Sequence, residues 1–253
     1  MKTNKIALVT GGSRGLGKEM SLQLIAKGID VVITYHQNRE AADTVVADIE
    51  KKGLKAKALQ LDTCDISCFK QFTNDLSSYL ISEYGQPEFD FLINNAGTGI
   101  YQPFLETTEA QFDAMVNVHF KGVYFLTQQL VPLLKDGGRI INISSGLTRF
   151  TFPNSSAYAA AKGAVEVFTK FLAKELAPRK IIANVVAPGG VATDFGGGEN
   201  KNNEQKRTML ASATALGRVG EADDIGGVVS FLCSDDAKWI NGQRIEVSGG
   251  VLL

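Results

Sequence analysis

The stretch IALVTGGSRGLG, residues 6–17, decides the fold. Its first four residues are apolar, as in a strand that is buried on both faces of a parallel sheet. Glycines follow at positions 11, 15 and 17, where a helix is expected to begin. Glycine permits a tight turn and lets the backbone approach a pyrophosphate at the helix N-terminus. A glycine-rich turn can be merely structural, but its place between a buried strand and a helix favours dinucleotide binding.

Beyond this turn, short β-branched runs alternate with longer amphipathic stretches. We expect strands at Ile6–Thr10, Asp30–Tyr35, Ala56–Leu61, Phe89–Asn94, Arg139–Ser144, Ile181–Ala187 and Gln243–Val247. We expect helices at Gly15–Lys27, Arg39–Lys52, Ile66–Glu83, Glu109–Lys135, Ser155–Leu176 and Asp223–Ser234. This alternation predicts an α/β fold, a Rossmann-type doubly wound parallel β-sheet of about seven strands with helices on both faces.

Helices on both faces of one sheet leave no room for a second core, so residues 1–253 are expected to form a single dinucleotide-binding Rossmann domain. The segment Asp194–Asn203 lacks regular periodicity and contains three consecutive glycines. A glycine-rich segment this late in the chain predicts a substrate lid around residues 194–215. A disordered surface loop is the alternative interpretation.

The composition restricts the partners and the chemistry. The 253 residues carry a net charge of -1, which does not support a nucleic-acid partner. No apolar run reaches the length of about 18 residues that would suggest a membrane span, and Met1–Lys5 lack the layout of a signal peptide. Three cysteines are typical of reduced thiols, so a cytoplasmic location is expected. With only two histidines, we expect no metal site and assign the acid–base chemistry to another residue type.

Tyr158 and Lys162 are four residues apart in a predicted helix, which places both side chains on one face. A free tyrosine has a pKa of about 10, and a nearby ammonium lowers that pKa by stabilising the phenolate. Tyr158 could then act as an acid in ketone reduction and as a base in alcohol oxidation. Taken alone, Tyr-x-x-x-Lys is a frequent accidental pairing on helices.

Four motifs together resemble those of the short-chain dehydrogenase/reductase family, including its 3-oxoacyl-[acyl-carrier-protein] reductase-like members. They are the G-x3-G-x-G turn at residues 11–17, NNAG at 94–97, Tyr158-x-x-x-Lys162, and PGGVAT at 188–193. The motifs occur in family order and span nearly the whole chain. The resemblance implies NAD(P)-dependent transfer of a hydride between the nicotinamide and a carbonyl or alcohol.

The resemblance also implies roles for individual residues. Ser145, 13 residues before Tyr158, would bond the substrate carbonyl oxygen and polarise it, whereas Ser144 is offset by one residue. Asn117 would hold a water that relays protons to Lys162, and His119 is expected to pack. The implied cofactor contacts are Gly11, Ser13, Arg14, Gly15, Leu16, Gly17, Asp62, Thr63, Asn95, Ala96, Gly97, Tyr158, Lys162, Pro188, Gly189, Val191 and Thr193.

The end of the second predicted strand bears on the choice between NADP(H) and NAD(H). In dinucleotide folds an acid at this point binds the ribose 2′-hydroxyl, but here the strand ends in Tyr35 and His36. Arg14 in the glycine turn could bind a 2′-phosphate bidentately, with help from His36 and Arg39. The sequence therefore favours NADP(H), with NAD(H) possible and a solvent-facing Arg14 as the alternative.

The substrate is expected to be a small carbonyl or alcohol, and a 3-oxoacyl thioester is slightly favoured over a sugar or a small alcohol. Tyr101, Phe195 and residues 147–150 are expected to wall the pocket, with Arg149 either meeting an acidic substrate or facing solvent. A non-catalytic nucleotide-binding protein is the remote alternative, because the fold alone would permit it. The resemblance implies a homo-oligomer, a dimer or homotetramer. Val165, Phe168 and Leu172, with the tail Val251–Leu253, could form its interface or belong to the core.

Overall fold

The computed structural model describes residues 4–253. Met1–Thr3 lie outside the described residues. They are the start of the predicted domain and part of the segment Met1–Lys5 that was compared with a signal peptide. Seven parallel strands form one sheet in the order β3-β2-β1-β4-β5-β6-β7. The strands are β1 (Ile6–Val9), β2 (Asp30–Tyr35), β3 (Ala56–Gln60), β4 (Phe89–Asn94), β5 (Leu134–Ile143), β6 (Ile182–Pro188) and β7 (Arg244–Val247). The strand order reverses between β1 and β4, where doubly wound folds form a crevice for a ligand. The predicted fold class is confirmed.

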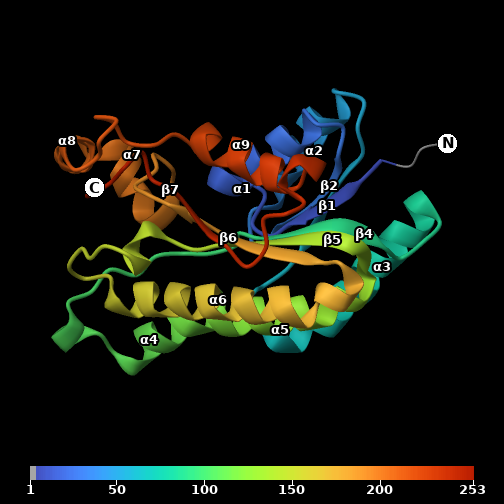
Figure 1. Ribbon diagram of the computed structural model, residues 1–253, viewed down its shortest axis with the longest axis horizontal. Helices are drawn as coiled ribbons and strands as arrows, with labels where there is room; N and C mark the ends of the chain where they lie inside the picture. Colours follow the sequence, from blue (N-terminus) through green and yellow to red (C-terminus); the bar gives the residue numbers. More distant parts are fainter. Residues whose placement is uncertain (1–3) are drawn as a thin grey trace.

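Helices cover both faces of the sheet (Figure 1). One face carries α1 (Gly15–Ile25), α2 (Arg39–Glu50) and α9 (Ala222–Leu232). The other carries α3 (Phe69–Tyr84), α5 (Gly122–Leu130) and α6 (Ser156–Glu175), with α4 (Glu109–Val116) packed against α6. The short helices α7 (Glu199–Asn202) and α8 (Glu204–Ser212) lie near the C-terminus.

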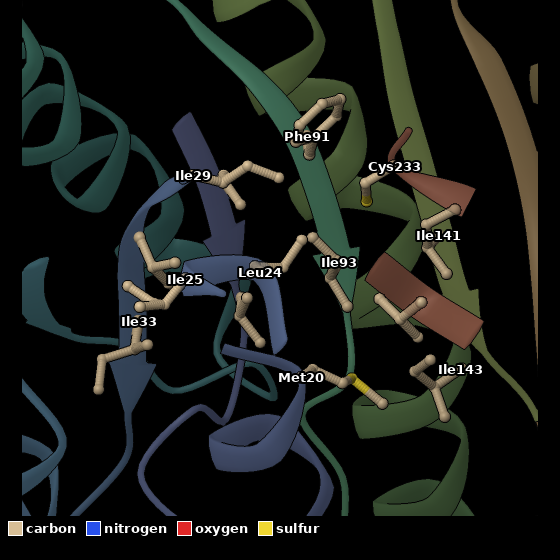
Figure 2. Packing of buried hydrophobic residues seen from close by; sticks show 14 of the residues in the cluster. Met20, Leu24, Ile25, Ile29, Ile33, Phe91, Ile93, Ile141, Ile143 and Cys233 are labelled. Atoms are coloured by element: carbon tan, nitrogen blue, oxygen red, sulfur yellow. The ribbon is translucent and has the colours of Figure 1, made fainter. Parts of the chain in front are cut away.

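The core consists of two hydrophobic layers separated by the sheet. Within β1, Ala7 and Val9 belong to one layer, whereas Ile6 and Leu8 belong to the other. Figure 2 shows the first layer, where Met20 and Leu24 of α1 share a cluster with Ile93 of β4 and Ile141 of β5. Each fully buried side chain of this size contributes about 1.5–3 kcal/mol relative to exposure. The apolar run of β1 is thus explained by burial on both of its faces.

The predicted helix Glu109–Lys135 is wrong in extent and regularity. A π-helical segment, Asn117–Lys121, separates α4 from α5, and its backbone bond runs from the Gly122 N–H to the Asn117 carbonyl. After α5, Pro132 lies in a 3₁₀ turn, because proline cannot donate the backbone bond that a continuing helix needs. Strand β5 then begins at Leu134, earlier than predicted, with a register shift opposite β4.

The segment predicted to lack regular structure, 194–203, is largely helical. Gly196, Gly197 and Gly198 have φ angles of 59°, 86° and 77°, a left-handed conformation that glycine adopts readily. α7 follows directly, and the Asn203 side chain then caps α8 by accepting a hydrogen bond from the Lys206 N–H (3.1 Å). The glycines therefore mark a turn between ordered elements, and a lid role for 194–215 stays a prediction.

The residues proposed for an oligomer interface fall into two groups. Val165, Leu172 and Val251 are buried in the chain's own core, and Phe168 is partly buried. Leu253 is exposed, as are Val167 and Phe171 on α6. A homo-oligomer stays a prediction, and these exposed residues are the ones available to it. Within residues 4–253, no helix has the length and apolar character that crossing a membrane requires.

Gly122 permits a close approach that holds α5 against the turn after β3. A Cβ at this position would lie 2.0 Å from the Thr63 carbonyl oxygen, which is backbone and cannot rotate away. We expect Gly122→Ala to lower the free energy of unfolding by about 1–3 kcal/mol through overpacking. Gly227→Ala is the matched control, because this glycine is exposed in α9 with nothing within 4 Å of its added Cβ.

Chemical denaturation of both variants measures the effect. The control should be neutral or gain up to about 1 kcal/mol from the better helix propensity of alanine. Equal stability of the two variants would contradict the close approach at Gly122.

Candidate active site

The glycine turn is tied to the end of β4 at the reversal of strand order. The Asn95 side-chain amide donates to the carbonyls of Thr10 (2.9 Å) and Gly11 (3.2 Å). The Thr10 hydroxyl accepts from the backbone N–H groups of Asn95 and Ala96, both at 2.9 Å. A Cβ on Gly17 would lie 2.2 Å from the Gly11 oxygen, so glycine is required there. The turn therefore presents the N-terminus of α1 in the form that binds a dinucleotide pyrophosphate.

The other turn residues surround this N-terminus. Arg14 is the exposed N-cap of α1, and Ser13 and Leu16 are partly buried, with Leu16 packed on the core. Gly15 lies beside Thr193, whose Cβ would be 3.6 Å from an added Gly15 Cβ. The loop after β6 is thereby brought against the glycine turn, as a site that spans a whole dinucleotide requires.

The ends of β2 and β3 place two predicted cofactor contacts together. His36 and Asp62 are half-exposed, and Nε2 of His36 lies 3.4 Å from a carboxylate oxygen of Asp62. The carboxylate of Asp62 also accepts from the Cys64 N–H (2.8 Å). Tyr35, in contrast, is buried in the first core layer, and Thr63 presents its carbonyl to Gly122. The carboxylate of Asp62, in the turn after β3, therefore lies beside His36 at the end of β2.

Tyr158 and Lys162 lie on α6 at the carboxyl end of β5, together with Ser145. Tyr158 is 7% exposed and Lys162 is 5% exposed. The Lys162 ammonium donates to the Ile143 carbonyl (2.6 Å) and lies 5.8 Å from the centre of the Tyr158 ring. The Ser145 oxygen accepts from the Leu147 N–H (3.2 Å), whereas Ser144 donates to Glu166 (2.7 Å) and so faces the other side. Of the two serines, Ser145 is the one beside Tyr158.

Burial controls the proton affinities of this pair. It raises the pKa of Tyr158, as does the nearby Tyr101, while a hydrogen bond between Ser145 and the Tyr158 hydroxyl opposes part of the rise. Lys162 is not among the causes of this shift, so a lowering of the Tyr158 pKa by the ammonium stays a prediction. Burial instead lowers the pKa of Lys162 to about 7. The protein holds a protonated phenol beside an amine that exchanges protons near neutral pH.

The π-helical segment packs on α6 and places His119 beside Tyr158, while the role of Asn117 stays a prediction. Asn117 opens the segment and is partly buried. His119 is fully buried, with its ring edge-on to the Tyr158 ring at a centroid distance of 4.8 Å. Its Nε2 lies 2.6 Å from the Thr98 carbonyl, next to Gly97. Sequence reasoning gave His119 a packing role, and no feature of the sequence signals its place beside Tyr158.

The loop after β6 closes the opposite side of the site. Gly189 donates to the Val247 carbonyl (3.0 Å) and follows Pro188 at the end of β6. Val191 and Thr193 are buried, and the Thr193 hydroxyl accepts from the Phe195 N–H (3.3 Å). This loop therefore positions Phe195 as well as the two predicted contacts.

Aromatic side chains cover Tyr158. The Phe195 ring lies 5.8 Å from the Tyr158 ring, and Tyr101 lies against Phe195 and the glycine at position 196. Leu147 packs in the same cluster. The ring of Tyr158 is therefore packed among apolar side chains, as expected of Phe195 and Leu147, while its hydroxyl faces Ser145.

An ion-pair network lies behind Ser145. Arg149 pairs with Glu246 (2.7 Å) and donates to the Val251 carbonyl, so its charge is already matched within the chain. Arg244 pairs with Glu166 (2.9 Å) and with Glu246 (3.0 Å), and donates to the Ser145 carbonyl (3.3 Å). Hydrogen bonds, chiefly from Arg149, lower the pKa of Glu246 to about 2. Sequence reasoning missed Arg244, Glu166 and Glu246, because nothing in their spacing links them.

Several curated proteins are similar to this chain over nearly its whole length. An uncharacterized oxidoreductase of Methylorubrum extorquens is 40% identical over 247 residues, which are 98% of this chain and 97% of that protein. A hydroxynaphthalene reductase-like protein, Arp2 of Metarhizium brunneum, is 35% identical over 257 residues, covering 97% and 94%. A short-chain dehydrogenase/reductase of Pestalotiopsis microspora is 37% identical over 256 residues, again covering 97% and 94%.

Solved structures are similar over nearly the full length of the chain. The landomycin C-6 ketoreductase LanV, solved with bound NADP and rabelomycin, has a TM-score of 0.90 at 36% identity and covers 99% of this chain and 97% of its own. The reductase LugOII, which catalyses keto-reduction at C1 during lugdunomycin biosynthesis, has a TM-score of 0.94 at 40% identity and covers 99% of both chains. The family model described as enoyl-(acyl carrier protein) reductase matches residues 11–252. The chain therefore belongs to the short-chain dehydrogenase/reductase family of oxidoreductases.

Proposed function

We propose that the protein reduces a ketone with NADPH, with Tyr158 as the proton donor. The observation that carries this proposal is the single buried site in which Ser145, Tyr158 and Lys162 meet, beside the glycine turn. NADPH, when bound, supplies the hydride. The hydroxyls of Ser145 and Tyr158 both donate to the carbonyl oxygen, which polarises the carbonyl and stabilises the charge that develops on its oxygen.

Proton transfer follows from the two shifted pKa values. Burial keeps Tyr158 protonated, so it approaches the ketone as an acid. Its proton passes to the carbonyl oxygen, and the resulting phenolate takes a proton from Lys162, whose pKa of about 7 lets it give one up near neutral pH. Solvent then reprotonates the amine. This order of proton affinities favours the reductive direction.

The residues of the turn fit NADP(H). The glycines at 11 and 17 let the turn pack closely against Ala96 and its own backbone, which leaves the start of α1 to face a pyrophosphate, and the exposed N-cap Arg14 can meet a 2′-phosphate. His36 lies next to the Asp62 carboxylate, with 3.4 Å between its Nε2 and the carboxylate oxygen. LanV and a short-chain dehydrogenase from Burkholderia cenocepacia were both solved with NADP, which supports the same choice.

The apolar walls favour a ketone on an aromatic or fused-ring system. Phe195 and Leu147 offer a ring face and methyl groups, and the Tyr101 hydroxyl is the one hydrogen-bonding group among these three wall residues, fewer than a sugar would need. Arg149, the one cation predicted near the pocket, is already paired with Glu246, so it is not free to bind an acidic or phosphate-bearing substrate. LanV was solved with rabelomycin, and several relatives are hydroxynaphthalene reductase-like. A 3-oxoacyl thioester, which the sequence resemblance favoured, is the second candidate, and the matched family model is described by a reductase of another acyl thioester, enoyl-(acyl carrier protein).

We expect Tyr158→Phe to retain NADPH binding and to lose about 10²–10⁴-fold in kcat, the usual contribution of a positioned general acid. The phenyl ring keeps the packing against Phe195 but lacks the proton. Absorbance of the reduced nicotinamide follows turnover, and nicotinamide fluorescence follows binding. Turnover at the wild-type rate would contradict the assignment of Tyr158.

We expect Arg14→Ala to raise KM for NADPH about 10–100-fold and to change KM for NADH little. The reason is that a hydrogen bond to a charged partner is worth about 1.5–3 kcal/mol and only NADPH carries the 2′-phosphate. Steady-state kinetics with both nucleotides measures the difference. An equal loss with both would show that Arg14 acts on the turn and not on the phosphate.

A substrate panel separates the two candidate substrates. We expect kcat/KM for a fused-ring aromatic ketone to exceed that for a 3-oxoacyl thioester by about tenfold or more, because added apolar contact in a pocket contributes about 1–3 kcal/mol. An open-chain sugar ketone serves as the polar control. A higher kcat/KM for the thioester would favour the second candidate.

A further inference from the structure

His119 is a buried titratable group that the reaction proposed above does not use. It has no solvent exposure, and its ring stands at 89° to the ring of Tyr158. It lies close enough to Lys162 for the ammonium charge to disfavour its protonation, and burial acts in the same direction, so the pKa of His119 lies well below its usual value. His119 is therefore a neutral imidazole beside the two residues that exchange protons.

Its hydrogen bond to the loop after β4 fixes which nitrogen carries the proton. Nε2 lies 2.6 Å from the Thr98 carbonyl, and a carbonyl oxygen can only accept. Nε2 must therefore carry the hydrogen. In a neutral ring, Nδ1 is then an acceptor with a free lone pair.

Within residues 4–253, this Nδ1 is buried and has no hydrogen-bond partner. Leaving a buried acceptor unsatisfied costs about 1–3 kcal/mol, so such groups are normally paired with the protein or with ordered water. Nδ1 would lie only 3.2 Å from a Cβ at Gly97, and the adjacent ring carbon would lie at 2.6 Å. The lone pair is thus on the side of the ring that borders the turn after β4, where only a glycine leaves space.

The Lys162 ammonium has N–H donors to offer to an acceptor. Its ammonium has three N–H donors, and the Ile143 carbonyl accepts one of them. The remaining donors belong to a side chain that is 5% exposed, and Lys162 and His119 both lie beside the Tyr158 ring, the ammonium at 5.8 Å and the imidazole at 4.8 Å from its centre. A buried acceptor and a buried donor group thus lie near each other without a direct bond, an arrangement that one water molecule can bridge.

We infer that His119 is a positioning residue, whose Nδ1 accepts a hydrogen bond from a water molecule that also contacts the Lys162 ammonium. This inference rests on the function proposed above. After Tyr158 has given its proton to the carbonyl oxygen, Lys162 gives a proton to the phenolate, the water gives one to the Lys162 amine, and solvent restores the water. His119 stays neutral throughout and supplies only the acceptor that orients this water.

Two alternatives differ in what they require. If His119 only packs, then its bond to Thr98 and its shape matter, and Nδ1 does not. If Asn117 alone orients the water, as predicted from the family resemblance, then Nδ1 again does not matter. Substitutions that remove one ring nitrogen at a time separate these roles.

The matched variants are His119→Gln and His119→Asn. The amide of glutamine reaches the place of Nε2, so it keeps the bond to Thr98 and loses the acceptor at Nδ1. The amide of asparagine ends at the place of Nδ1, so it keeps the acceptor and loses the bond to Thr98. Asn117→Ala is assayed beside them, and thermal unfolding of each variant shows whether it is folded.

We expect His119→Gln to lower kcat about tenfold or more with KM for NADPH and for the ketone unchanged, as removal of a proton-relay group does. His119→Asn should recover most of that kcat even if its melting temperature is lower. The inference is overturned if glutamine keeps the wild-type kcat, or if asparagine is the more damaging of the two in kcat.

NMR spectroscopy tests whether Nδ1 of His119 accepts a hydrogen bond, and it does so without measuring turnover. The chain contains two histidines, so ¹⁵N-histidine labelling gives few signals, and His36→Gln assigns them. In the NADPH-bound wild type, we expect the Nδ1 resonance of His119 to lie upfield of a free pyridine-type nitrogen, because it accepts a hydrogen bond. An unshifted resonance overturns the inference. Absence of ketone turnover in the wild type would instead count against the proposed function, and the spectrum would still report on His119.

Discussion

The chemistry of this protein depends on one buried ammonium and the carbonyl that holds it. Lys162 is almost entirely removed from water, and the Ile143 carbonyl at the end of β5 is its one hydrogen-bond acceptor among the described residues. A buried cation without a carboxylate is costly, and the protein meets this cost by lowering the proton affinity of the amine. A residue that would be permanently charged on the surface thus becomes one that can exchange protons.

Much of this arrangement was predictable from the order of residues. All seven strands were found, because short apolar or β-branched runs alternate with amphipathic stretches, and in β1 the run is uninterrupted because both of its faces are buried. The glycine turn, Tyr158 and Lys162 were found because chemistry limits the residue types at those positions. The structure brings these residues and Ser145 to one edge of the sheet, since parallel strands end on the same side.

The features that could not be predicted depend on contacts between segments that are far apart in the sequence. No proline occurs between Glu109 and Val131 to mark the interruption at Asn117–Lys121, so the two helices looked like one. The position of His119 depends on the backbone of Thr98, and that of Arg149 on Glu246, nearly one hundred residues further along the chain. Neither partner can be identified from local spacing. His119 was therefore predicted to pack, and Arg149 was predicted either to meet an acidic substrate or to face solvent.

The π-helical segment has a geometrical consequence for the site. Each residue of an α-helix turns the chain by about 100°, and a π turn accommodates one residue more than an α turn does. Gly122 and the rest of α5 pack on the sheet. The side chains just before Gly122 are rotated about the helix axis relative to the directions they would have in a regular α-helix. The extra residue therefore changes the direction in which the preceding side chains point. His119 can face the site while the apolar face of α5 packs on the sheet, although both belong to one continuous run of helix.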